Sequence, residues 1–234
     1  MKMVFSFALM LWVGPVVSGQ PAFTNLNFES AVLIPQSGDP YYRVQFAAAF
    51  PGWTAYVGGV PQNLALYNNQ FLDSSGVGLV DGSAFRGLIS GNFTAFLQGG
   101  VALGTPNLGD AALAQTGLVP LTAESLRFRA ELGGFWPTGP GELVVTLGGQ
   151  ALSPIPIASG SNFTIYAADI HAWAGQTAEL RFTAISPNPH VNNNNWFLDS
   201  ITFSSVPVPE PSLFALLAVG SLAGWACRRQ FRRK

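Results

Sequence analysis

Charged side chains are scarce in this sequence of 234 residues, and that scarcity excludes several classes of protein. Asp, Glu, Lys and Arg make up 10% of the chain, against about 25% in a typical soluble domain. The formal net charge of −1 excludes a nucleic-acid-binding protein, which would carry a basic surface. A single cysteine, Cys227, excludes a disulfide framework and any site built from several cysteines.

Groups that commonly carry out catalysis are also scarce. The only lysines, Lys2 and Lys234, lie at the two ends of the chain, so the rest has neither a Schiff-base lysine nor a phosphate-binding loop. His171 and His190 are the only histidines, and no serine lies in a G-x-S-x-G motif. We therefore predict a protein that is not an enzyme and that requires no cofactor.

The sequence does contain the apolar residues that a core needs. Its 18 Phe and 6 Trp, within a hydrophobic fraction of 48%, exclude a wholly disordered chain. The length allows one domain of about 150–200 residues together with targeting segments. Residues 20–211 hold all twelve acids but only five basic residues, which gives this part a net charge of −7. We expect it to avoid nucleic acid and anionic lipid, while neutral glycans or calcium remain open as partners.

The first residues have the order of a secretory signal peptide. Lys2 precedes an apolar run at residues 3–13, and small or β-branched residues follow up to Gly19. This order predicts a signal peptide at residues 1–19. The alternative is an uncleaved anchor, but eleven helical residues rise only about 16 Å, which is short of a hydrocarbon core of about 30 Å.

The last residues combine prolines, an apolar segment and basic residues. Residues 206–211 form a Pro-rich stalk, residues 212–227 are uncharged, and residues 228–234 carry the positive charge. We predict a transmembrane helix at 212–227, because this segment has no polar face that would fit a buried amphipathic helix. The basic residues that keep the tail cytoplasmic are Arg228, Arg229, Arg232, Arg233 and Lys234.

The same end resembles the PEP-CTERM sorting signal of Gram-negative bacteria. The matching parts are Pro209-Glu210-Pro211, the apolar segment and the arginine-rich terminus, in that order. The resemblance implies processing near the motif by an exosortase. The chain would be anchored in the inner membrane before processing and would then reach the cell envelope or extracellular matrix. The alternative is that Pro-Glu-Pro is only a stiff stalk before an anchor.

Residues 20–205 consist of short segments typical of strands. Apolar and polar residues alternate in 125–132 and 178–185, which predicts strands with one buried face. The pair Gly148-Gly149 predicts a hairpin that joins 142–147 to 150–157, with Pro154 and Pro156 placing the second strand at a sheet edge. Further strands are expected at 26–28, 53–57, 76–80, 93–97, 162–168 and 196–203, and a short helical turn at 170–174.

The predicted fold is all-β: a single antiparallel β-sandwich between the signal peptide and the transmembrane helix. Residues 114–132, 166–185 and 195–211 resemble the jelly-roll domain often found before such signals, which is similar to galactose-binding-like and carbohydrate-binding modules. This resemblance implies a structural calcium ion held by Glu29 and Asp199. The alternative is that both are ordinary hydrogen-bonded acids.

Sugar binding would need an exposed aromatic face, because pyranose rings stack on such surfaces. Trp53 and Trp136 are the candidate carbohydrate-binding residues, whereas we expect Trp173 and Trp196 to fill the core. The leading hypothesis is therefore a non-catalytic envelope protein that associates with extracellular polysaccharide. The alternatives are a structural matrix protein without a small ligand and, least favoured, a carbohydrate-active enzyme.

Overall fold

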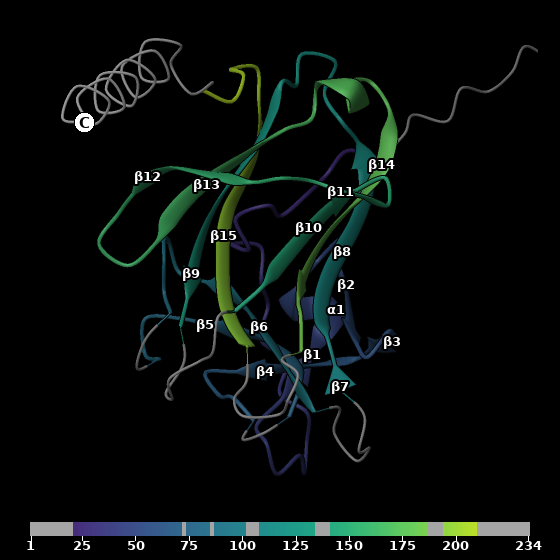
Figure 1. The fold of residues 1–234 in the computed structure, drawn as a ribbon. Helices are drawn as coiled ribbons and strands as arrows, with labels where there is room; N and C mark the ends of the chain where they lie inside the picture. The colour runs from purple at the N-terminus through teal and green to yellow at the C-terminus, as the bar shows by residue number, and fades with distance from the viewer. Residues whose placement is uncertain are drawn as a thin grey trace, which may run out of the picture.

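The computed structural model describes residues 21–71, 74–84, 87–101, 108–133, 141–186 and 194–209, which form a sandwich of two sheets (Figure 1). The larger sheet runs in the order β1 (Val44–Gln45), β4 (Leu64–Tyr67), β5 (Gly76–Val80), β6 (Thr94–Val101), β15 (Asn194–Ser204), β9 (Ser125–Leu132), β13 (Thr164–Asp169) and β12 (Ile155–Ser159), with β7 (Leu108–Gly109) paired to β6. The smaller sheet runs in the order β11 (Gln150–Ala151), β10 (Leu143–Leu147), β14 (Thr177–Ala184), β8 (Ala111–Leu118), β2 (Thr54–Val57) and β3 (Val60–Gln62).

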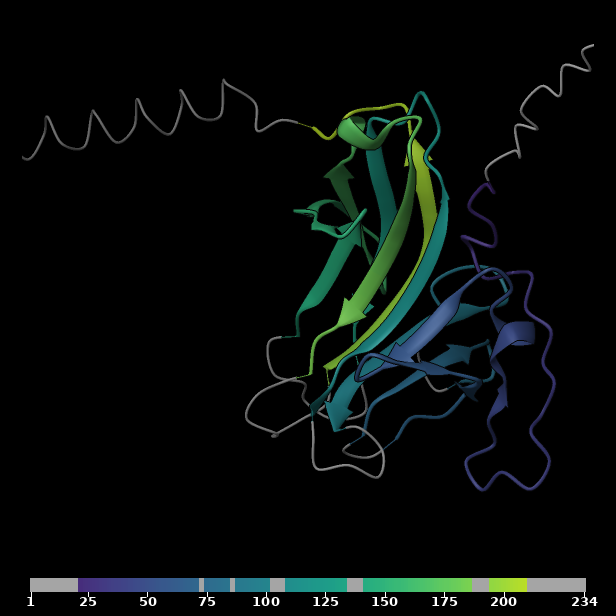
Figure 2. The same cartoon turned by 90° about the vertical axis from the view of Figure 1, so that its right-hand side faces the viewer.

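The two sheets lie face to face along most of the molecule. Figure 1 shows β12, β13, β9 and β15 on one side and β10, β14, β8 and β2 on the other, and Figure 2 shows the long curved strands from the side. Among the described strands only β4 and β5 pair in parallel, so the predicted antiparallel sandwich is confirmed apart from this one pair. Two short helical elements, α1 (Phe46–Ala49) and η1 (His171–Trp173), complete the described structure.

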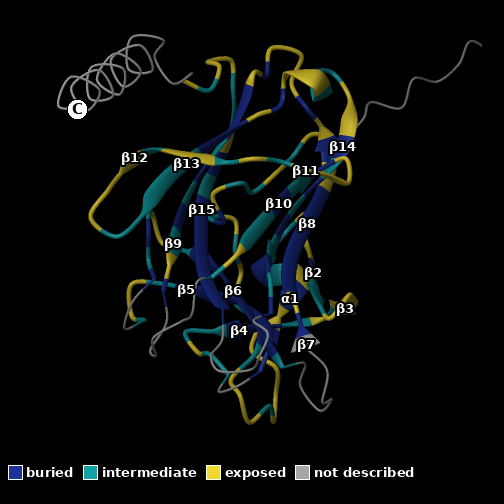
Figure 3. Cartoon of the chain, in the orientation of Figure 1, coloured by how far each residue is buried: buried dark blue, intermediate teal, exposed yellow. Residues whose placement is uncertain are grey.

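The core forms where the inward faces of the two sheets meet (Figure 3). The alternation predicted for β14 is confirmed, because Leu180, Phe182 and Ala184 are fully buried while the residues between them are half-buried. The pattern in β9 holds through Ala130, but Leu132 at the end of the strand is 41% exposed rather than inward. A smaller cluster lies on the other face of the larger sheet and consists of Val80, Ile89, Phe96 and Phe197.

The predicted hairpin forms at its turn but not along its whole second strand. Gly148 and Gly149 have φ of +58° and +78°, values that glycine adopts without steric cost, and they join β10 to β11. The expected strand 150–157 is divided, because the chain leaves the smaller sheet after Ala151 and pairs with β13 of the larger sheet as β12. Both β11 and β12 are edge strands, as the prolines predict.

One predicted strand does not form. Residues 26–28 make a turn, with Phe28 at φ +60° and fully buried. The turn packs against a bulge in β15, where Ser200 also has a positive φ and the Ile201 N–H donates to the Leu26 carbonyl. The signal peptide, the predicted transmembrane helix and the basic tail lie outside the described residues. In the part that is described, no helix is long and apolar enough to cross a membrane.

Candidate functional site

A pocket of about 240 Å³ lies at the open edge of the sandwich, between the two sheets. We call it the edge pocket. The larger sheet supplies Phe128 from β9, Tyr166 from β13 and Trp196 from β15, and the smaller sheet supplies the start of β10. The lining residue at the start of β10 is Leu143, and the other lining residues are Gly141, Glu142 and Pro154. The Phe128 and Tyr166 rings are nearly parallel, with centroids 5.4 Å apart. Phe128 is 2% exposed, so Tyr166 supplies the accessible part of this aromatic pair.

Two buried polar atoms beside the edge pocket have no hydrogen-bond partner within the protein. Trp196 is 8% exposed, and its indole Nε1–H is buried without a hydrogen-bond partner. Asn194 points to the same side of β15, two residues earlier, and its Oδ1 is likewise buried and unpaired. Its Nδ2 donates to the Glu142 carbonyl at 2.7 Å, which holds the amide beside the pocket. A buried unpaired donor costs about 1–3 kcal/mol. The indole N–H is closed to solvent, so a ligand oxygen would recover that energy once the pocket wall opened to admit it.

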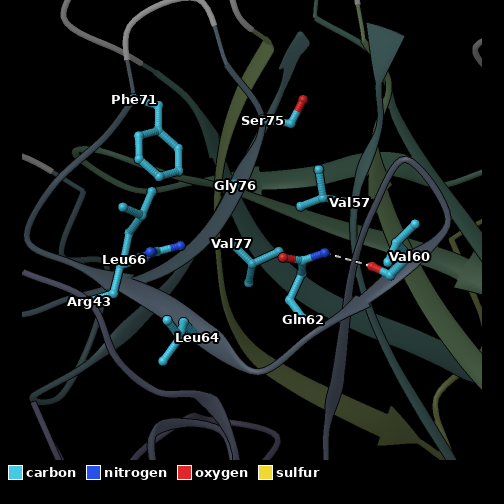
Figure 4. A pocket seen from close by; sticks show the side chains of 10 residues that line it. All are labelled: Arg43, Val57, Val60, Gln62, Leu64, Leu66, Phe71, Ser75, Gly76 and Val77. Carbon is cyan, nitrogen blue, oxygen red and sulfur yellow. Dashed lines mark hydrogen bonds between the residues drawn. The ribbon is translucent and has the colours of Figure 1, made fainter. Parts of the chain in front are cut away.

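A second cavity, of about 230 Å³, is less well equipped to recognise a ligand (Figure 4). Its lining is mostly apolar, and its polar groups already bond within the protein. The Arg43 guanidinium pairs with Asp39, the Gln62 amide donates to the Val60 carbonyl at 2.8 Å, and the Ser75 hydroxyl bonds to the backbone. We therefore take the edge pocket as the better candidate site.

The outer face of the smaller sheet carries one further aromatic feature. The Arg181 guanidinium of β14 lies 4.4 Å from the centroid of the Tyr56 ring of β2 and also pairs with Glu179 at 2.9 Å. The hydrogen bond to Glu179 raises the pKa of Arg181. Strand β8 lies between them, with Ala112 opposite Tyr56 and Ala114 opposite Arg181. The guanidinium already covers the Tyr56 ring, so this face offers less to a sugar than the edge pocket does.

The two tryptophans predicted to bind carbohydrate have different outcomes. Trp53 is only 5% exposed, and its Nε1–H donates to the Asn25 carbonyl at 3.1 Å. The expectation that Trp53 offers a stacking face is wrong, because its ring packs against Phe28 in the core. Trp136 lies outside the described residues. Trp196 is buried as expected, and Trp173 packs partly buried against the core.

Glu29 and Asp199 lie at the junction of the 25–30 turn, the turn before β6 and the β15 bulge. The Glu29 carboxylate accepts hydrogen bonds from the backbone N–H groups of Asn92 and Phe93 and from the Asn92 side chain, at 2.8–3.1 Å. These bonds occupy its oxygens with donors rather than leaving them free for a cation. The contacts therefore agree with a carboxylate that fixes the turn.

Asp199 is 1% exposed and is held by the Thr94 hydroxyl at 2.8 Å and by the Ser200 N–H. Burial raises the pKa of Asp199 from 3.8 to about 6, and the negative charge of Glu29 adds to this. Calcium takes six to eight oxygen ligands, and no cluster of three or more acidic, His or Cys side chains occurs in the described ranges. As they are arranged, these two acids do not fit a calcium shell, and the calcium site stays a prediction.

The start of the stalk is bonded to the sandwich. The Val206 carbonyl accepts from the Ser125 hydroxyl at 2.6 Å and from Arg127 Nη2 at 3.3 Å, and the Pro207 carbonyl accepts from the same guanidinium at 3.4 Å. Pro209 is the last described residue, so Glu210, Pro211 and the basic tail lie beyond it.

Comparison with known families identifies this end of the chain. Residues 207–233 are a PEP-CTERM protein-sorting motif. A PEP-CTERM motif is recognised by an exosortase, and it implies export to the surface with membrane anchoring before processing. The match confirms the predicted resemblance and concerns only this terminal segment, so the sorting motif identifies how the protein is delivered and not what the sandwich binds. No curated protein matches the sequence.

The solved structures that resemble the fold distantly include the following two. One is the enzymatically active domain of tailspike protein 4 from bacteriophage CBA120, with 15% identity, a TM-score of 0.36 and 64% of this chain covered; this chain spans about a fifth of its length (19%). The other is a family 11 carbohydrate-binding module from Clostridium thermocellum in complex with a β-1,3-1,4-mixed-linked tetrasaccharide, with 8% identity, a TM-score of 0.32, and coverage of 68% of this chain and 92% of the module. At these TM-scores neither likeness carries an argument about ligands.

Several functional candidates were not visible in the sequence. Phe128 and Tyr166 lie on predicted strands, but nothing in the sequence indicates that they line one pocket with Trp196. Arg127 and Ser125 were predicted only as outward residues of one strand. Ser125 is nevertheless fully buried, because the start of the stalk covers it.

Proposed function

We propose that this exported protein is a non-catalytic, surface-displayed β-sandwich that associates with a neutral extracellular polysaccharide through the edge pocket. The observation that carries the proposal is the buried, unpaired indole N–H of Trp196 in an aromatic-lined pocket. The PEP-CTERM motif implies delivery of the protein to the surface, which is where an extracellular polysaccharide would be met.

The chemistry of a sugar ring matches what the edge pocket offers. The C–H face of a pyranose packs on aromatic surface, and Tyr166, which is half-buried, supplies that surface while the buried Phe128 ring supports it. Its hydroxyls both accept and donate, so one can accept from Trp196 Nε1 and another can donate to Asn194 Oδ1. The carboxylate of Glu142, a residue in the lining, is a further acceptor.

The size and charge of the protein narrow the ligand class. A volume of about 240 Å³ lies below the ~300–1,000 Å³ of pockets for drug-sized ligands, so the edge pocket suits one sugar unit of a chain rather than an enclosed oligosaccharide. The net charge of −7 over residues 20–211 disfavours acidic polysaccharides, because like charges repel. A neutral glycan therefore fits best.

The test compares aromatic variants on an array of neutral glycans. Trp196→Phe removes only the indole N–H and part of the ring, and Tyr166→Ala removes one side of the aromatic wall. Each is expected to weaken binding about tenfold or more, the equivalent of roughly 1.4 kcal/mol. Tyr56→Ala, on the outer face of the other sheet, is the matched aromatic control and is expected to bind like the wild type. Because the proposed function is non-catalytic, the mass of the glycan is expected to stay unchanged after incubation with the protein.

Two results would contradict the proposal. Equal binding by wild type and Trp196→Phe would remove the edge pocket as the site, and loss of binding with Tyr56→Ala alone would move the site to the outer face. The burial of Trp53 favours one alternative, a structural matrix protein without a small ligand. That alternative predicts no glycan binding by any variant, together with self-association of the wild type.

A further inference from the structure

The first residues of the stalk cannot extend β15 by ordinary strand pairing. Proline has no backbone N–H, and Pro207, Pro209 and Pro211 alternate with other residues in this segment. Only the carbonyl groups of these prolines can take part in hydrogen bonds, so any contact that holds them needs donors from elsewhere. Side chains of β9 supply those donors.

Ser125 and Arg127 lie on the same face of β9, and both reach the stalk. Ser125 Oγ donates to the Val206 carbonyl at 2.6 Å, while Arg127 Nη2 lies 3.3 Å from that carbonyl and 3.4 Å from the Pro207 carbonyl. Arg127 Nε also donates to Ser125 Oγ at 3.2 Å, so the two side chains act together. We call this pair the stalk clasp.

The stalk clasp holds the chain where the sorting motif begins. The match to the motif starts at residue 207, which is the last residue that the clasp contacts. The uncharged segment predicted to enter the membrane starts at residue 212. Residues 208–211 are therefore the only part of the chain between the clasp and that segment, and at about 3.3–3.6 Å per extended residue they span no more than roughly 15 Å.

We propose that the stalk clasp determines where the exosortase cuts, by holding the carbonyls of Val206 and Pro207 so that the cut falls on the C-terminal side of the Pro207–Val208 bond. A peptidase needs its substrate backbone free of other hydrogen bonds, and the carbonyls of Val206 and Pro207 are already bonded to β9. In the cut, one peptide bond breaks: its carbonyl carbon passes to water or to an acceptor amine or hydroxyl, and the C-terminal fragment leaves with a free amino group. The mature protein then keeps its new C-terminus bonded to the sandwich.

Two variants of Arg127 and one control test the clasp. Arg127→Ala removes the donor to the Pro207 carbonyl and one of the two donors to the Val206 carbonyl. Arg127→Lys keeps the charge but loses the planar fork that serves two acceptors. Arg129→Ala is the matched control, because Arg129 lies two residues along the same strand face and stacks over Phe163, 4.8 Å from its centroid. It makes no hydrogen bond to residues 206–209, the part of the stalk that the structure describes. All variants are made in the full chain.

The first measurement asks whether the clasp holds the stalk in solution. A nitroxide is attached at Val208→Cys, with Cys227→Ser in the background, and its mobility is read by electron paramagnetic resonance in detergent micelles. We expect a slow, broadened spectrum in the wild type and in Arg129→Ala, and a several-fold faster rotational correlation time in Arg127→Ala, with Arg127→Lys between them. Equal mobility in wild type and Arg127→Ala would overturn the proposal.

The second measurement asks whether the clasp determines the cut. Each chain is expressed in a bacterium that contains an exosortase, and the C-terminus of the mature protein is identified by mass spectrometry. The wild type is expected to end within residues 208–211, because the Pro207 carbonyl is held, whereas Arg127→Ala is expected to give additional products that end at residue 207. A wild-type terminus before residue 208 would contradict the proposal, as would unchanged products from an Arg127→Ala chain whose stalk is mobile.

Discussion

The pH dependence of stability tests the environment of Asp199 most sharply. Burial raises the pKa of this carboxyl group from 3.8 to about 6, so the folded protein holds a proton that the unfolded chain loses near pH 4. Stability is then highest below pH 4 with respect to this group and falls as the pH rises through about 6. One pKa unit corresponds to about 1.4 kcal/mol, so the full loss is at most roughly 3 kcal/mol.

The assay is urea unfolding of the wild type and of Asp199→Asn between pH 4 and pH 7.5, with the protein in a mild non-ionic detergent. The amide that replaces the carboxyl group in this variant cannot ionise, so the difference in unfolding free energy between variant and wild type should rise in favour of the variant by about 2–3 kcal/mol across this range. Curves that stay parallel would refute the assigned environment. A second experiment adds calcium at pH 7. If Glu29 and Asp199 hold the ion, calcium should raise the Tm of the wild type and EGTA should reverse the rise, whereas the Tm of Asp199→Asn should not change.

Two further pairs of variants test local features. In urea titrations without ligand, Trp53→Phe should lower the unfolding free energy by about 2 kcal/mol more than Trp196→Phe does. The reason is that only the Trp53 indole N–H has an acceptor within the protein, which the substitution leaves unpaired. Equal losses would mean that the Trp196 indole N–H has a partner too. Gly91→Ala should lower the unfolding free energy by about 1–3 kcal/mol, since Gly91 has φ +62° and a Cβ there would lie 2.2 Å from Glu29 Oε1. Gly149 has φ +78°, and a Cβ there would meet no atom within 4 Å, so Gly149→Ala should lower the unfolding free energy only by the backbone strain. If the Gly91→Ala and Gly149→Ala variants were equally stable in the same assay, the role of Glu29 would be contradicted.

Local patterns predicted the strands that have one buried and one exposed face. In β9 and β14 the period of two residues is visible because one side of each strand faces the core and the other faces solvent. β8 gave no such pattern, since its sequence AALAQTGL is rich in small residues and Ala112 and Ala114 on its outer face are only 4% exposed. Its strand conformation comes from pairing with β14 and β2 on its two sides.

The turn at 26–28 and the division of 150–157 depend on contacts that are distant in the sequence. Phe28 adopts a positive φ because the turn packs on the bulge of β15, and β12 forms because β13 offers an unpaired edge. The same limit applies to the candidate site. The edge pocket combines Phe128, Tyr166 and Trp196 from three different strands. The spacing of residues in the sequence does not predict which tryptophan indole N–H has a hydrogen-bond acceptor in the fold.

The sorting signal was the most predictable feature, because its recognition depends on the order of residues in one short segment. Pro209, the apolar run and the terminal arginines are adjacent in the sequence, and the family match confirms the signal they form. What the stalk bonds to could not be predicted in this way. Arg127 lies some eighty residues before the carbonyls that it contacts, and only the pairing of β15 with β9 brings them together.

The central claim is that Trp196 donates a hydrogen bond to a bound sugar in the edge pocket. The most direct measurement is a ¹H–¹⁵N NMR titration of the tryptophan indole groups with neutral polysaccharide fragments. The Trp196 indole signal should move downfield and saturate with the glycan, while the signals of Trp53 and Trp173 stay in place. A Trp196 signal that does not move for any glycan bound by the wild-type protein would contradict the account.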